Sequence, residues 1–457
     1  MATFFIDQHG CAKNQTDGEL LSSYLEKSGF TFTDDPQKAD FIIINSCGFI
    51  QSAKKESIDA VYAAKKGYPN AKIILAGCLA ERYANDLYEA MPELDGIFGN
   101  GDLSKITEYM KKVKAACKKE SRAKPALYEQ TGVCAGERTR FFGFKGSAFV
   151  KITEGCSNNC SFCAIPLIRG AVRSRSCEDI VQEIKSLVAS GIYEINLIGQ
   201  DLAAFKDGKL SLAALLKKIS KLKGNFIVRP LYIHPDHFNL DILEVFKNDK
   251  RFLPYFDIPF QSGDDEIIHA MNRKGSSRQY VELIKNIREQ LPDMALRTTF
   301  LTGFPGETDK AAKNTQDFLK KIKPMWSGCF AYSREEGTPA YSFKNRVPVR
   351  IAKERASALE EIQTEFTFKQ LSHYVGTEQS ILIEEIITSS DDEGLAIGRA
   401  WFQAPEVDGC VVVRYDADDK NQTAQIEAGK VVKVKILACT GPDLDSRLLV
   451  SPVPVKG

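Results

Sequence analysis

The sequence predicts an α/β protein built from an amino-terminal parallel-sheet domain, a central partial (β/α)6 barrel of the TIM type and a small carboxyl-terminal antiparallel β-barrel. Three observations lead to this prediction. Strand-sized apolar runs alternate with helical patterns as far as about residue 371, and short strands without helices follow. The chain has 457 residues, which is too long for one ordinary core. We expect these parts to occupy residues 1–118, 147–371 and 372–442, with a linker at 119–146 and a tail at 443–457.

The first part contains three apolar runs that lack the alternation of a half-exposed strand. They are ATFFID, DFIIIN and AKIILA, and helical patterns follow near residues 14–28, 50–66 and 81–91. Uninterrupted apolar strands separated by helices are typical of a parallel sheet covered on both faces.

The central part repeats the strand–helix alternation six times. The expected strands are AFVKIT, YEINLIG, FIVRPLY, YFDIP, ALRTTFL and GCFAYS, and a long final helix is expected at about Pro348–Leu371. Six such units in this length indicate an open or partial barrel, with its chemistry at the carboxyl ends of the strands.

The last part has strand patterns separated by turns rich in Asp and Gly. The expected strands are SILIEEII, LAIGRAWF, GCVVVRY and GKVVKVKILA. Short strands without helices favour a small β-barrel.

Composition narrows the class of protein. No apolar run approaches the ~20 residues of a membrane span, and the first residues lack a secretory pattern, so we expect a cytoplasmic protein without a membrane partner. The net charge of +1 argues neither for nor against nucleic acid. Twelve cysteines in a reducing compartment suggest metal binding or catalysis rather than disulfides.

Three of these cysteines lie on one short segment, GCSNNCSFC, just after a predicted strand. Cys156, Cys160 and Cys163 can ligate three irons of a cubane cluster and leave the fourth iron open. Structural zinc is the alternative, but it requires a fourth ligand, and the nearest His in the sequence is His234.

Three more cysteines each follow an expected strand of the first domain. Cys11, Cys47 and Cys78 would meet at the carboxyl edge of a parallel sheet, where ligands bind. They predict a second three-thiolate cluster, whereas three separately buried cysteines are the alternative.

The spacing of the central cysteines, with Phe162 before the last, resembles the radical S-adenosylmethionine superfamily. Longer strings resemble its methylthiotransferase family over nearly the whole chain, and the last part resembles a TRAM domain. The strings are GCAKNQTDGE, NSCGFIQSAKKES, GCLAERY, EGCSNNCSFCAIPLIRGAVRSR, LIGQD, TFLTGFPGET and FAYSREEGTPA.

The resemblance implies a transferase with two [4Fe-4S] clusters and S-adenosylmethionine as cofactors. The central cluster would cleave S-adenosylmethionine to a 5′-deoxyadenosyl radical, and the amino-terminal cluster would supply or carry sulfur for a methylthio group. All six cysteines are therefore candidate ligands and catalytic residues. A reductant such as flavodoxin or ferredoxin would be a partner.

Family members modify either an aspartate β-carbon in a small-subunit ribosomal protein, protein twelve, or an adenosine in transfer RNA. Residues 373–441 hold twelve acidic and six basic residues, a net charge of −6. Such a barrel would repel a polyphosphate and attract a basic ribosomal protein, although an acidic surface also serves solubility. We therefore expect the ribosomal protein, free or in the ribosomal particle. Transfer RNA is the alternative, direct RNA binding is not favoured, and a pure electron carrier would need no open iron.

The expected contacts to S-adenosylmethionine are one aromatic, three polar and one glycine residue at strand ends and turns. They are Phe162, Gln200, Gln261, Thr299 and Gly303.

Two positions depart from the family pattern, Leu202 after the Gln-Asp pair and Ser262 where a His is frequent. They put the finer contacts to cofactor and substrate in doubt. We interpret His234 and His237 as ordinary loop residues. Arg169, Arg173 and Arg175, which follow the cysteine loop, either neutralise cluster or cofactor charge or are exposed.

Overall fold

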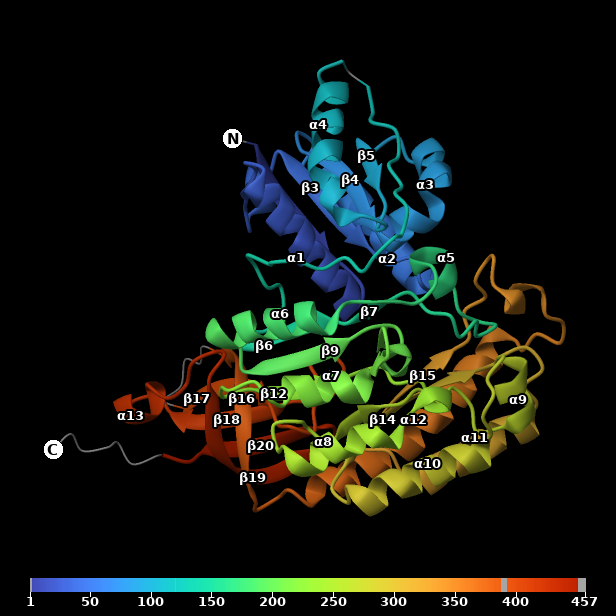
Figure 1. Ribbon diagram of the computed structural model, residues 1–457, viewed down its shortest axis with the longest axis vertical. Coiled ribbons are helices and arrows are strands. Elements are labelled where there is room, and N and C mark those ends of the chain that lie inside the picture. The colour runs from blue at the N-terminus through green and yellow to red at the C-terminus, as the bar shows by residue number, and fades with distance from the viewer. Residues whose placement is uncertain (1, 120, 388–392, 451–457) are drawn as a thin grey trace.

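The computed structural model describes residues 2–119, 121–387 and 393–450. The amino-terminal domain stands on the central barrel, and the carboxyl-terminal barrel packs against the side of the central barrel (Figure 1).

The amino-terminal sheet has five parallel strands in the order β2-β1-β3-β4-β5. Helices α1 and α4 contribute to the core on one face, and α2 and α3 contribute to the core on the other, as expected for a buried parallel sheet. The sequence analysis missed β2 and β5, which are too short to show a pattern. The bounds are β1 Thr3–Gln8, α1 Ala12–Lys27, β2 Thr31–Phe32, β3 Phe41–Ser46, α2 Gln51–Gly67, β4 Lys72–Gly77, α3 Cys78–Ala90, β5 Gly96–Phe98 and α4 Ile106–Cys117.

The predicted linker at 119–146 is packed against both neighbouring domains. Buried Arg138 donates hydrogen bonds to Glu19 of α1 and to Glu183 of the central domain, at 2.7 and 2.8 Å. This segment therefore fixes the amino-terminal domain to the central barrel.

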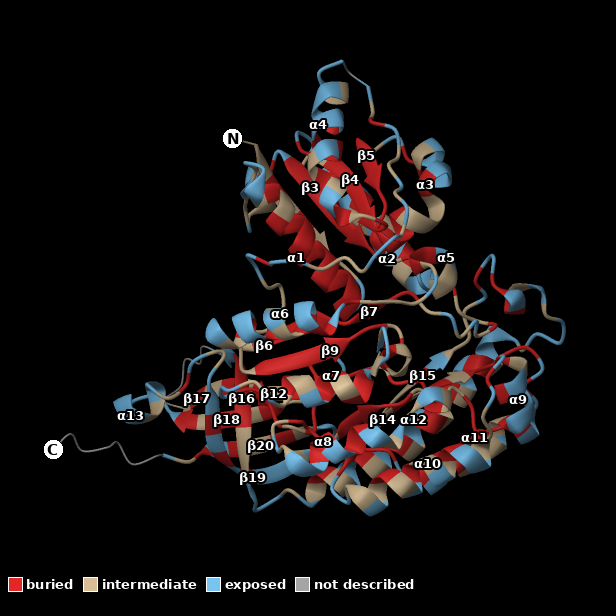
Figure 2. Ribbon diagram, in the orientation of Figure 1, coloured by how far each residue is buried: buried red, intermediate tan, exposed pale blue. Residues whose placement is uncertain are grey.

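The central domain has six main strands in two parallel sheets of three, in the orders β12-β9-β6 and β13-β14-β15. This is the predicted open barrel, in which β12 and β13 are neighbours without a continuous ladder. Its strands and the inner faces of its helices are largely buried, whereas the outer faces of helices such as α10 are exposed (Figure 2). The bounds are β6 Ser147–Lys151, β7 Thr153–Glu154, α5 Ile165–Arg169, β8 Arg173–Ser174, α6 Cys177–Ala189, β9 Glu194–Ile198, β10 Lys206–Asp207, β11 Leu210–Ser211, α7 Leu212–Ile219, β12 Ile227–Pro230, α8 Leu243–Asn248, β13 Tyr255–Asp257, α9 Asp265–Ala270, α10 Ser277–Gln290, β14 Ala295–Thr302, α11 Asp309–Ile322, β15 Trp326–Ala331 and α12 Val349–Ser372.

The carboxyl-terminal strands form a closed barrel in the order β16-β17-β18-β20-β19. Two predictions are wrong here. Strand β20 lies within the segment predicted as a tail, and β18 and β20 pair in parallel, so the barrel is not wholly antiparallel. An odd number of strands in a closed ring requires at least one parallel pair. The bounds are β16 Glu378–Ile387, β17 Glu393–Arg399, β18 Val411–Asp416, α13 Lys420–Thr423, β19 Val431–Thr440 and β20 Asp443–Leu448. Asp391 and Asp392, which entered the charge count, and the end of the predicted tail lie outside the described residues.

The loop between β17 and β18 inserts into the open central barrel. Phe402 of this loop is fully buried, and its carbonyl accepts a hydrogen bond from the indole of Trp326 at 2.7 Å. Arg229 of β12 donates to the Trp401 carbonyl at 2.8 Å. One continuous core therefore joins the two barrels. Throughout the described ranges, we find no helix with the length and apolar character needed to cross a membrane.

Candidate functional site

A cavity of about 320 Å³ lies between the amino-terminal domain and the central barrel, and all six predicted cysteines line it. Cys11, Cys47 and Cys78 follow β1, β3 and β4, while Gln200, Gln261 and Thr299 come from the carboxyl ends of central strands or the turns after them. The carboxyl edges of the two sheets therefore face each other across one space. Helix α5, which also borders this space, lies close to α2 and α3 in Figure 1.

The amino-terminal cysteines meet because of the strand order. The chain runs outward from β1 to β2 and then returns to β3, so β1 and β3 form the topological switch point where open sheets bind ligands. Gly10 and Gly77, which precede Cys11 and Cys78, have φ values of 87° and 89°. A Cβ at Gly10 would lie 3.0 Å from the Cβ of Cys47, and one at Gly77 would lie 2.7 Å from the carbonyl of Ser46. Glycine therefore permits the close approach of these turns.

The central cysteines lie on the loop between β7 and α5, and several bonds fix this loop. The short strands β7 and β8 pair across its base. The amide of Asn158 donates to Asp201 at 2.9 Å, and Asp201 also accepts from the backbone of His234 at 3.1 Å. Asp201 thus ties the cysteine loop to the ends of β9 and β12.

Burial strongly affects the thiols. It raises the pKa of Cys47 and Cys163 to about 12 and that of Cys156 to about 11, with neighbouring cysteines adding to the effect. Burial also acts on Cys11, but Lys13 and Arg169 together lower its pKa. Thiolates at the other three positions need a positively charged ligand, such as iron, to stabilise them.

Arg169 connects the two halves of the site. Its side chain is 2% exposed, and it donates to the sulfur of Cys78 at 3.2 Å while it pairs with Asp17 at 2.7 Å and with Glu154. Of the two interpretations of Arg169, the structure therefore excludes the exposed one. It places the positive charge beside an amino-terminal thiol.

His234, interpreted from the sequence as an ordinary loop residue, lines the cavity. Its Nε2 lies 4.0 Å from the sulfur of Cys160, and its Nδ1 accepts the backbone N–H of Asp236 at 3.3 Å. Burial and the nearby Arg273 lower the pKa of His234 to about 4, so the ring is neutral at pH 7. His237 pairs with Asp201 at 3.1 Å and lies outside the lining.

Four of the five expected cofactor contacts line the cavity, namely Phe162, Gln200, Gln261 and Thr299. Within the described chain the buried Oε1 of Gln200 has no hydrogen-bond partner, which is unusual and indicates a missing donor. Gln261 has a φ of 69°, a rare conformation for a non-glycine residue that occurs at ligand sites.

Gly303 does not line the cavity, contrary to expectation. Its turn packs closely against α12. A Cβ added at Gly303 would lie 2.2 Å from the Cβ of Ala352, so glycine is needed here for the turn to pack against the helix. The two departures from the family pattern also lie outside the lining. Leu202 is buried in the core, and the hydroxyl of Ser262 lies 3.2 Å from that of Thr315.

The arrangement of ligands fits clusters better than single ions. Among residues 2–119, 121–387 and 393–450, no three His, Cys, Asp or Glu side chains converge closely enough to hold one metal ion. A zinc site requires such convergence, whereas three cysteines that ligate a cubane cluster each bind a different iron. Two separate sets of three thiols on one lining therefore fit two iron–sulfur clusters.

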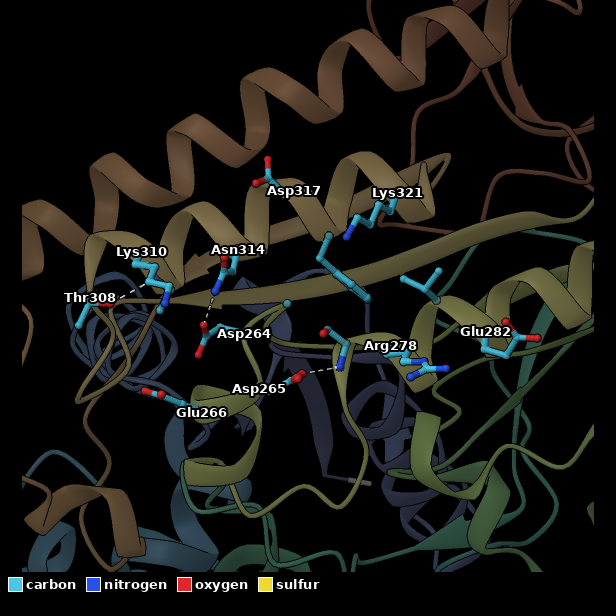
Figure 3. A pocket seen from close by; sticks show the side chains of 15 residues that line it. Asp264, Asp265, Glu266, Arg278, Glu282, Thr308, Lys310, Asn314, Asp317 and Lys321 are labelled. Atoms are coloured by element: carbon cyan, nitrogen blue, oxygen red, sulfur yellow. Dashed lines mark hydrogen bonds between the residues drawn. The ribbon is translucent and has the colours of Figure 1, made fainter.

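A larger hollow of about 610 Å³ lies outside the barrel between α9, α10 and α11 (Figure 3). Acidic and basic side chains line it together, and two of its aspartates accept hydrogen bonds from other lining residues. Asn314 donates to Asp264 at 2.7 Å, and the backbone of Ser277 donates to Asp265 at 2.7 Å (Figure 3). It contains no cysteine, so we do not assign the chemistry to it.

Lys13, Asn158 and Arg273 are among the lining residues that were not identified from the sequence. Lys13 and Asn158 lie within strings that carried the resemblance, GCAKN and GCSNNC, so proximity to the cysteines was a usable signal. Arg273 follows α9 and had no such signal.

Three family models match the chain. They are described as the uncharacterized protein family UPF0004 at residues 3–99, the radical SAM superfamily at 150–319 and the TRAM domain at 375–448.

Curated relatives match nearly the whole chain. A protein of Treponema denticola named ribosomal protein uS12 methylthiotransferase RimO is 51% identical over 96% of this chain and 99% of its own. Proteins of the same name from Pseudothermotoga lettingae and Natranaerobius thermophilus are 38% and 37% identical, covering 96% and 95% of this chain and 98% and 96% of theirs. Among solved structures, the radical S-adenosylmethionine methyltransferase TsrM from Kitasatospora setae has a TM-score of 0.54 at 13% identity, with 74% of each chain covered. That likeness concerns the fold.

Proposed function

The chain belongs to the RimO family of ribosomal protein uS12 methylthiotransferases, and from this premise we propose how its site carries out that reaction. The enzyme adds a methylthio group to the β-carbon of an aspartate in the small-subunit ribosomal protein uS12. The observation that carries the assignment of its site is that two sets of three cysteines line one cavity.

The proposed ligand sets are Cys156, Cys160 and Cys163 for the central [4Fe-4S] cluster and Cys11, Cys47 and Cys78 for an amino-terminal one. When bound, these clusters and S-adenosylmethionine supply the electron, the radical and the sulfur of the reaction. The separate strand edges that carry the two sets support two clusters rather than one. Burial raises the pKa of Cys78, and the positive charge of Arg169 beside its sulfur opposes this effect.

Gln200, Gln261, Thr299 and Phe162 are the proposed contacts to S-adenosylmethionine. The Oε1 of Gln200, which has no hydrogen-bond partner in the described chain, would accept a hydrogen bond from the cofactor, and Phe162 would offer an apolar surface. Asp201 keeps the cysteine loop in place through Asn158. Both domains contribute to the lining of this space and would limit the access of bulk water, which protects a reactive radical.

The proposal requires two partners in the cytoplasm, uS12 itself and a reductant such as flavodoxin or ferredoxin. The net charge of −6 in residues 373–441 supports attraction of a basic ribosomal protein and disfavours a polyphosphate. Direct RNA binding by the TRAM-like barrel is therefore not part of the proposal.

The test uses anaerobically reconstituted protein, S-adenosylmethionine and a reductant with two substrates in parallel, a peptide of the uS12 aspartate loop and unmodified transfer RNA. Mass spectrometry should find a gain of about 46 Da on the peptide alone. A gain on RNA alone would overturn the proposal. The Cys156→Ala and Cys11→Ala variants locate the steps, because only the first should abolish formation of 5′-deoxyadenosine.

A further inference from the structure

Lys13 is a buried cation in the cavity whose role the proposed reaction leaves open. It lies two residues after Cys11 in the first turn of α1, and it is 8% exposed. Its ammonium lies 3.2 Å from the ring centroid of Tyr232, another lining residue, so a cation–π contact holds it in place. Within the described ranges it has no ion pair with a carboxylate.

The other two cations of the lining have hydrogen-bond acceptors. Arg169 pairs with Asp17 and Glu154. Arg273, which within the described ranges has no ion pair either, donates to the backbone carbonyls of Pro259 and Phe260. No Asp or Glu is among the lining residues. Asp257 acts on Lys13 only through space, because its carboxylate pairs with Arg297. A buried charge without a paired carboxylate is costly, so the lysine is expected to gain an anionic group when the cavity is filled.

We propose that Lys13 binds the side-chain carboxylate of the substrate aspartate and thereby selects aspartate. The inference rests on the proposed function. The β-carbon is bonded directly to the carboxylate carbon, so a carboxylate held at Lys13 brings the β-carbon to the side of the cavity that carries Cys11. Sulfur from the amino-terminal cysteines would then reach the carbon that reacts.

Lys13 could instead serve only as a counter-ion for the amino-terminal thiolates. The two roles predict different results for an aspartate peptide and its asparagine analogue, which differ in charge and not in size. If Lys13 is only a counter-ion, it changes the affinity for both peptides equally. If it binds the substrate carboxylate, it raises the affinity for the aspartate peptide alone.

The experiment measures binding of both uS12-loop peptides to the cluster-loaded protein, anaerobically and without reductant, so that no turnover occurs. We expect the wild type to prefer the aspartate peptide about tenfold or more, and Lys13→Met to bring the ratio close to one. Arg273→Met is the matched control, because it removes a lining cation on the side of Cys156 and Cys163 and should preserve the ratio. A Lys13→Met protein that keeps the wild-type ratio, or that loses both peptides equally, would overturn the inference.

A second measurement needs no variant. A carbodiimide-activated aspartate peptide should form an amide with Lys13 of the wild-type protein, which peptide mapping would locate. Coupling to other lysines alone would also overturn the inference. Suppose that the wild type modifies the peptide, but Lys13→Met keeps the wild-type binding ratio and no amide forms with Lys13. Then only the role of Lys13 fails. If the wild type neither binds nor modifies the peptide, the proposed function itself fails.

Discussion

Single charged residues decide how the two domains meet around the cavity. Asp17 of α1 faces Lys151 of β6 and Arg169 of α5, and Glu154 pairs with the same two cations. All four side chains are at most 3% exposed. Buried pairs of this kind do not guarantee net stability, but the loss of one partner leaves an uncompensated charge.

Glu154 should make stability depend on acidity. Although burial opposes ionisation, Lys151 and Arg169 lower the pKa of Glu154 to about 2, against an ordinary value of 4.5. The folded-state pKa is depressed, so the stabilisation is complete above pH 4.5 and is lost as the pH falls towards 2. The full effect amounts to about 3 kcal/mol. Urea unfolding of the cluster-free protein between pH 6 and 3 should show it.

Glu154→Gln is the control for this dependence, because it removes the titrating group and keeps its size. The variant should be less stable at pH 6 and should lose part of the acid-dependent slope. An unchanged slope would mean that other carboxylates cause the acid sensitivity.

At the scale of elements, the loop between β17 and β18 matters as much as the strands it joins. The ring of Phe402 stacks on Tyr374 with centroids 4.1 Å apart, and Arg399 at the end of β17 pairs with Glu194 of β9 at 2.6 Å. Burial opposes ionisation of Glu194, yet Arg399 and Arg229 hold its pKa far below the usual range. The loop is therefore part of the central core.

Phe402→Ala should cost about 3–5 kcal/mol of unfolding free energy, because it opens a hole where the two barrels share a core. Thermal or denaturant unfolding of the purified protein measures it. Phe368→Ala on α12, where the ring is 47% exposed, is the matched control and should change stability by about 0.5 kcal/mol or less. Equal losses in both variants would contradict the role of the loop.

At the scale of the whole molecule, the cavity exists only because two domains close over it. On the side opposite α1, Glu335 of the central domain accepts hydrogen bonds from Lys54 of α2 at 2.8 Å and from Arg82 of α3 at 2.7 Å. The glutamate is 3% exposed. It thus fastens the amino-terminal domain at a second place.

Glu335→Ala should loosen this closure, because it leaves Lys54 and Arg82 without their carboxylate. We expect faster hydrogen exchange in residues 48–54 and 332–340, with little change in α10. Glu336→Ala is the control, since only its backbone carbonyl is engaged by Arg82. Exchange that stays at the wild-type rate in both segments would show that other contacts keep the domains closed.

Local patterns were sufficient to predict the main strands, the helices between them and the two cysteine sets. Apolar runs such as FIIIN and the position of Cys47 after one of them contain this information. The fifth barrel strand was missed because DLDSRL has only two apolar residues, and it acquires its role by pairing with β18 and β19. His234 was not assigned to the site for a related reason, since its place at the cavity depends on contacts between distant segments.

The inserted loop of the carboxyl-terminal barrel also limits how such enzymes can be recombined. The carbonyls of Trp401 and Phe402 accept hydrogen bonds from Arg229 and Trp326 of the central domain. A barrel taken from another enzyme would therefore place a different loop in the core of this central domain. A chimera that exchanges the barrel alone should fail in its central domain before substrate choice can be examined. Retargeting by domain exchange would have to transfer the loop and the residues that receive it as one unit.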